Sequence, residues 1–231
     1  MIHAPTFGEH IYSPVTAKKM ITLDEVGELG ERDDITRVLN VGSYDFPQHL
    51  GHTNALEFSK HFKSLIEKFP EYAGLLGDFG RVDPVNTFLL VAMNSDASYD
   101  LLNDKYLVER GHGKIASHKE GERARQIANL EVVDGVVLFD EERALEVMQL
   151  YRPHVFTKGG DYVLDPKHAD AEHPAIDQEE REMVEGMGGI VALMPVGVDK
   201  NGDAYHSYHH IRTLAQTHGF LDKGLAGKDG K

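Results

Sequence analysis

Arg37-Val38-Leu39-Asn40-Val41-Gly42 is a short, mostly apolar run that ends in a glycine, and this pattern predicts a buried β-strand. A polar turn follows, and from Thr53 apolar residues recur at the spacing of a helix face as far as Phe69. Pro70 cannot continue a helix interior, so the predicted helix ends before it. A strand, a turn and a helix in this order form the first unit of an α/β fold.

The same alternation recurs along the rest of the chain. Apolar runs that predict further strands cover residues 88–93, 133–139, 155–157 and 190–195. Helical spacing covers residues 122–130, 141–151, 178–185 and 206–217, and a charged loop is expected at 99–121. This order predicts a Rossmann-like, open parallel five-stranded sheet with helices on both faces. We expect the domain to span 36–218, with an N-terminal extension at 1–35, an insertion near 70–86 and a disordered tail at 219–231.

Composition restricts the function classes. The chain has 231 residues, and its 24 Lys and Arg face 38 Asp and Glu, which disfavours broad nucleic-acid binding. Cysteine is absent, so disulfides, thiolate catalysis and cysteine-ligated zinc are excluded. No apolar run approaches the roughly 20 residues that span a bilayer, and the N-terminus lacks a secretory signal pattern. We therefore expect a cytoplasmic protein with no membrane partner.

The first strand-to-helix turn carries the candidate chemistry. In a sheet of this class, ligands bind beyond the carboxyl ends of the strands. The turn after Gly42 contains Gly51 and two histidines, His49 and His52, where a helix begins. A helix N-terminus offers free N–H groups to phosphate, and a glycine lets the backbone approach a ligand. The alternative is that the histidines only cap the helix and the glycines only make the turn.

Four segments resemble one family. Gly42-Ser43-Tyr44-Asp45 followed by His49-Leu50-Gly51-His52 resembles the HxGH signature of the cytidylyltransferase-like nucleotidyltransferases. Residues 94–98 (NSDAS) and 153–162 (PHVFTKGGDY) are similar to segments of the ADP-heptose synthase adenylyltransferases. Glu122-Arg123, which leads into the next strand, resembles the glycerol-3-phosphate cytidylyltransferase group. The resemblance covers roughly residues 36–165.

The resemblance implies an enzyme that transfers NMP from ATP or CTP to a phosphorylated sugar or polyol and releases pyrophosphate. A phosphate oxygen of the acceptor would attack the α-phosphorus in line, with Mg²⁺ as cofactor and no general base. Many relatives are homodimers, so a homodimer is implied as well. The catalytic residues that the resemblance implies are His49, His52, Arg123 and Lys158. The nucleotide-binding residues that it implies are Gly42, Ser43, Tyr44, Asp45, Gly51, Asn94, Asp96, Gly159, Gly160, Asp161, Ser207 and Arg212.

Lysines and a charge run leave local alternatives open. Lys158 either contacts substrate or is a strand-end residue with its head in solvent. Lys105, Lys114 and Lys119 lie in the loop where the family often keeps a phosphate-binding lysine, and a solvated loop is the favoured interpretation for each. Residues 179–182 (EERE) are expected to form a solvated helix face.

The end of the chain departs from the family pattern. Where the family has S-T-T or S-S-T, this chain has Ser207-Tyr208-His209, followed by Arg212. NMN and phosphopantetheine adenylyltransferases are disfavoured for this reason. A catalytically silent nucleotide-binding or assembly module is the alternative function. A third, a metal-binding protein, would pair His206 with His210 on one helix face and add His168, His173 or nearby acids.

Overall fold

The computed structural model describes residues 14–44, 50–68, 86–102, 118–159, 162–169 and 174–194. In order, the elements are α1 (Pro14–Lys19), α2 (Leu23–Gly30), β1 (Thr36–Gly42), α3 (Leu50–Lys68), β2 (Thr87–Asn94), α5 (Glu120–Ala128), β3 (Gly135–Phe139), α6 (Leu145–Tyr151), β4 (Val155–Gly159), the 3₁₀ turn η3 (Pro166–His168), α7 (Gln178–Gly186) and β5 (Ile190–Met194). Residues 96–102 are also helical.

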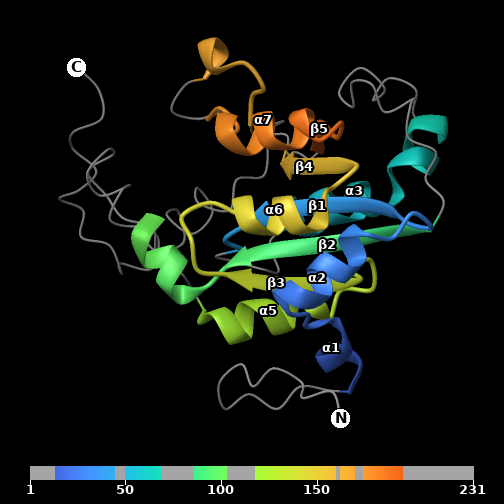
Figure 1. The fold of residues 1–231 in the computed structure, drawn as a ribbon, viewed down its shortest axis with the longest axis vertical. Helices are drawn as coiled ribbons and strands as arrows, with labels where there is room; N and C mark the ends of the chain where they lie inside the picture. The colour runs from blue at the N-terminus through green and yellow to red at the C-terminus, as the bar shows by residue number, and fades with distance from the viewer. Residues whose placement is uncertain are drawn as a thin grey trace.

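The five strands form one parallel sheet in the order β3-β2-β1-β4-β5, which confirms the predicted Rossmann-like class. Figure 1 shows the strands stacked in this order, with α6 in front of the sheet and α3 behind it. All five predicted strands are found within one or two residues of their expected bounds. Their apolar runs are continuous because helices cover both faces of the sheet.

Two hydrophobic cores lie on the two faces of the sheet. Helices α3 and α5 cover one face, and α2, α6 and α7 cover the other. Leu56 and Ile127 are among the buried residues of the first core, and Val26, Met148 and Val184 are among those of the second. Each core joins residues that are far apart in the chain, so the strand ends are held in fixed relative positions.

The segment before β1 packs on the sheet. Thr22 caps α2 in a capping box with Glu25, and Val26 is buried under α6. Met20 bridges Val136 of β3, and the Ile21 amide donates to the Val136 carbonyl over 2.9 Å. This contact satisfies part of the exposed edge of β3. The predicted boundary between an extension and a domain at residue 36 stays a prediction.

Helix boundaries differ from the expected ones in four places, one of them α5, which spans Glu120–Ala128 where 122–130 was predicted. Helix α3 begins at Leu50, three residues earlier than predicted, so His52 lies in its first turn. Helix α6 begins at Leu145 and not at 141, because residues 141–143 form a bend. Residues 99–102, predicted as loop, are helical. In the part of the chain that the structure describes, no helix is long and apolar enough to cross a bilayer.

Candidate functional site

The strand order reverses between β1 and β4, and the candidate site lies at this point. Strand β1 pairs with β2 on one side and with β4 on the other, and Asn40 lies opposite Thr157. The register therefore brings the end of β1, at Gly42, beside the end of β4, at Gly159. A crevice for ligands opens at such a reversal, beyond the carboxyl ends of the strands.

The turn after β1 is built around Tyr44. This residue has φ +51°, a left-handed conformation that few non-glycine residues adopt, and its side chain is buried. Its hydroxyl donates to the side-chain carbonyl oxygen of Asn40. A Cβ on Gly42 would lie 3.1 Å from the Tyr44 ring, so a glycine suits the close approach. Burial raises the pKa of Tyr44 far above its usual value, which keeps this donor protonated.

Tyr44 also contacts the histidine of the candidate site. The rings of Tyr44 and His52 are 5.1 Å apart between centroids at an interplanar angle of 66°, an edge-to-face pair. His52 is half-buried, and Gly51 beside it is buried. The first turn of α3 is thus held against the turn that follows β1.

A buried polar network fixes the floor of this site. The Asn40 amide donates to the Thr157 hydroxyl over 2.9 Å and to the Thr157 carbonyl over 3.2 Å. Ser59 of α3 donates to the same hydroxyl over 2.9 Å, and Thr157 donates to the Leu39 carbonyl over 3.1 Å. The network joins α3, β1 and β4. Asn40 was not predicted as a site residue, although an amide inside an otherwise apolar strand is a signal for such a role.

Arg123 is fully buried and contacts the turn that follows β1. Its side chain is 0% exposed. The guanidinium donates to the Ser43 carbonyl, to the His118 carbonyl over 3.2 Å and to Asp96 Oδ1 over 3.2 Å, and it lies over the Tyr99 ring. The resemblance implies an arginine near the phosphates. In the described structure the guanidinium contacts the backbone of the turn, so it positions that turn.

Asp96 connects the end of β2 to α5. Its Oδ1 accepts from the Glu120 amide over 2.9 Å, and its own amide donates to Glu120 Oε2 over 2.6 Å. Lys119 lies 3.4 Å from Asp96 Oδ2 with an 80% exposed side chain. Asn94, at the end of β2, donates to the Ser98 hydroxyl over 2.6 Å. Asn94 and Asp96 therefore brace the strand end next to the turn, and Lys119 remains accessible.

Lys158 is enclosed, so the alternative that places its head in solvent does not hold. Its side chain is 12% exposed, and its ammonium donates to the Val41 carbonyl over 3.0 Å. The rings of Phe156 and Tyr162 lie 5.5 and 5.6 Å from it, measured to their centroids. The Glu180 carboxylate lies 3.7 Å away. Lys158 thus reaches across from β4 to the end of β1.

Residues 179–182 do not all face solvent, so that prediction is wrong for Glu180. The Glu180 side chain is 6% exposed, because α7 packs on the sheet with Glu180 and Val184 on its buried face. Asp177 caps α7 by accepting from the amides of Glu179 and Glu180. Burial opposes ionisation of Asp177, and hydrogen bonds, above all from Arg143, nevertheless hold its pKa below the usual value.

Six predicted site residues lie outside the described residues: His49, Asp45, Gly160, Asp161, Ser207 and Arg212. The loop lysines Lys105 and Lys114 lie outside them as well. The same holds for the predicted helix at 206–217, and for His173, His206 and His210 of the metal alternative. His168 lies in η3. Within the described ranges, no three side chains of the metal-binding types are grouped closely enough to hold an ion. The structure places the other predicted site residues near the carboxyl ends of β1, β2 and β4: Gly42, Ser43, Tyr44, Gly51, His52, Asn94, Asp96, Arg123, Lys158 and Gly159.

Comparison with known proteins confirms the family resemblance. The chain is 32% identical over 188 residues to the bifunctional protein HldE of Koribacter versatilis, an alignment that covers 79% of this chain and 29% of the relative. It is 37% identical over 106 residues to the bifunctional protein HldE of Geobacter sulfurreducens, covering 46% of this chain and 18% of the relative. The chain thus spans less than a third of the curated relatives it matches.

No protein-family model matches the chain. The solved structure of a lipopolysaccharide core biosynthesis protein from Thermoplasma volcanium GSS1 aligns with 71% of this chain and 97% of its own, at 22% identity and a TM-score of 0.42.

Proposed function

We propose that this chain, which belongs to the cytidylyltransferase-like nucleotidyltransferases, transfers NMP from ATP or CTP to a phosphorylated sugar or polyol and releases pyrophosphate. The observation that carries the proposal is the position of the motif residues. The Gly42–Tyr44 turn, the first turn of α3 with His52, and Lys158 of β4 meet where the strand order reverses.

The geometry suits phosphoryl chemistry that needs alignment and charge neutralisation more than proton transfer. Backbone N–H groups at the start of α3 and the His52 imidazole would bind phosphate oxygens of the NTP. Arg123 and Tyr44 would hold the turn so that these donors keep their direction when negative charge develops on the leaving pyrophosphate. The acceptor phosphate is already ionised at neutral pH and attacks without a general base.

Magnesium in this proposal enters with the nucleotide. The described residues offer no group of three ligands for a metal ion, and the Asp96 carboxylate is already engaged by Arg123 and Lys119. Mg²⁺ is commonly held by substrate phosphates and water with few protein ligands, so a Mg–NTP complex is the expected substrate form. We also propose that the protein is cytoplasmic and forms a homodimer.

The test is pyrophosphate release with Mg²⁺, each of the four NTPs and a panel of sugar and polyol phosphates. Release that requires both one NTP and one acceptor supports the proposal and identifies the substrates. NTP binding without release from any pair would support the silent nucleotide-binding module instead.

A His52→Ala variant separates catalysis from helix capping. Because the imidazole is half-buried and its described ring contact is with Tyr44, we expect loss of nucleotidyl transfer with a cost in folding of only about 1 kcal/mol. The measurements are pyrophosphate release and thermal melting. A variant that unfolds, with full activity in whatever remains folded, would assign His52 to structure alone.

A further inference from the structure

Lys158 and Glu180 form a buried ion pair at the ends of the strands. The family resemblance implies a role for Lys158 and none for Glu180. Both side chains are largely withdrawn from water, at 12% and 6% exposure. Burying two charges is costly, and a protein gains from such a pair chiefly when it fixes a specific arrangement. The pair lies at the reversal point between β1 and β4.

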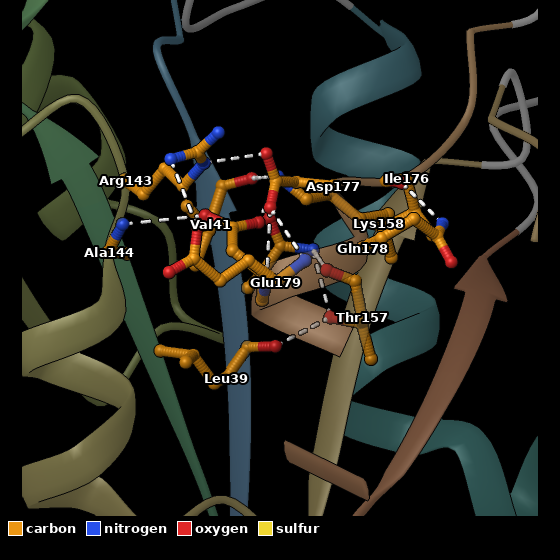
Figure 2. A network of polar contacts seen from close by, with 12 residues as sticks. Leu39, Val41, Arg143, Ala144, Thr157, Lys158, Ile176, Asp177, Gln178 and Glu179 are labelled. Carbon is orange, nitrogen blue, oxygen red and sulfur yellow. Dashed lines mark hydrogen bonds and ion pairs between the residues drawn. The ribbon is translucent and has the colours of Figure 1, made fainter. Parts of the chain in front are cut away.

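Glu180 is held in place independently of Lys158. Arg143 Nε lies 2.8 Å from Asp177, and Arg143 Nη1 lies 3.1 Å from Glu179, which anchors the first turn of α7 to the segment before α6. Figure 2 shows Arg143, Asp177 and Glu179 together above the end of β1, close to Lys158. One Glu180 oxygen also accepts from the Ala144 amide over 3.4 Å. Since the carboxylate is tied to two helices, it is the flexible lysine that adjusts to it.

Lys158 keeps bonding capacity in this arrangement. An ammonium carries three N–H donors. Among the described residues, its one hydrogen-bond acceptor is the Val41 carbonyl, because the 3.7 Å separation from Glu180 exceeds hydrogen-bond length. The ammonium is therefore able to donate to a further acceptor at the strand ends, where a substrate phosphate would supply one.

We propose that Lys158 contacts an anionic phosphate group of the substrate and that Glu180 is its positioning residue. Glu180 holds the ammonium against the end of β1 and offsets its charge. The offset limits the attraction for any single anion, so that product phosphates are not retained. This inference rests on the proposed function for the identity of the substrate, but not for the electrostatic effect of Glu180.

The test is binding of inorganic pyrophosphate to the full chain, measured by calorimetry at low salt, for the wild type and Glu180→Gln. Glutamine keeps the size of the side chain and an acceptor for the Ala144 amide, and it removes the negative charge. A unit charge removed within about 8 Å of a bound anion, at an effective dielectric near 20, changes affinity by roughly tenfold or more. We expect pyrophosphate to bind about tenfold more tightly to Glu180→Gln.

Two further variants make the test specific. Glu182→Gln removes the same charge from an exposed position on α7 and is expected to change pyrophosphate affinity less than twofold. In the Lys158→Gln background, adding Glu180→Gln is expected to give a much smaller gain than it gives in the wild type. An effect of Glu180→Gln no larger than that of Glu182→Gln, or one that is undiminished without Lys158, would overturn the inference.

If Glu180→Gln does not fold, the Lys158→Gln variant tests the inference by itself. Lys158→Gln alone leaves the Glu180 charge without its partner and is expected to weaken pyrophosphate binding more than tenfold. Wild-type affinity in that variant would refute the inference. Because calorimetry requires no turnover, failure of the proposed reaction and failure of this inference are distinguishable.

Discussion

Replacing Arg123 by lysine tests whether the buried guanidinium holds the Ser43 turn. The arginine makes three hydrogen bonds, to the Ser43 carbonyl, the His118 carbonyl and Asp96. A lysine has a single nitrogen at the end of a differently shaped chain, and we expect it to keep the ion pair and lose about two of the three contacts. Each loss costs about 1.5 kcal/mol, because a charged donor is removed from a buried acceptor. The predicted loss of folding free energy is therefore about 3 kcal/mol.

The assay is thermal or urea unfolding of Arg123→Lys beside a matched control. In a chain of this size 1 kcal/mol corresponds to roughly 2–4 °C in Tm, so we expect a fall of about 6–12 °C. Arg125→Lys, at a half-buried position on the same helix, should change Tm by about 2 °C or less. Equal Tm values for the two variants would show that the Arg123 contacts do not carry the stability assigned to them.

The remaining predictions concern packing and pH. A Gly30→Ala change should destabilise the fold by about 2 kcal/mol or more, because the new Cβ would lie 1.9 Å from the Leu150 carbonyl oxygen. The control Gly186→Ala meets no atom within 4 Å and should be neutral or stabilising in urea unfolding. Equal effects of the two changes would contradict the packing of Gly30 on Leu150. Burial lowers the pKa of His154 in the folded chain, so the unfolded chain binds the proton more readily and folding stability should fall as pH drops below about 6.5. A His154→Gln variant should lose that part of the pH dependence, and an unchanged slope between pH 7 and 5 would refute the assignment.

The fold was predictable because its signals are local. Each strand is an apolar run bounded by turn residues, and the alternation with helices leaves few arrangements other than a doubly covered parallel sheet. Helix starts were less predictable. Helix α6 begins only at Leu145. Arg143, two residues before it, pairs with Asp177, which lies 34 residues further along the chain. A contact at that separation has no local signature.

The candidate site divides in the same way. The Gly42–Tyr44 turn and His52 were predicted from the resemblance to the HxGH signature, because their spacing alone left helix capping as an alternative. The role of Arg123 in holding the Ser43 carbonyl depends on how α5 packs beneath the turn. A sequence pattern identifies the residue type at such a position, and only tertiary packing determines which atom the side chain contacts.

Glu180 shows how the helix period corrects an expectation drawn from charge. A run of charged residues predicts a solvated face when it is considered residue by residue, yet an α-helix places residues four apart on one side. Val184, four residues after Glu180 in α7, is buried in the core on that face of the sheet. Glu180 lies one turn before it on the same side of the helix, where a carboxylate needs a positive partner. Lys158 at the end of β4 is that partner, so the same periodicity that buries α7 also brings a negative charge to the proposed substrate site.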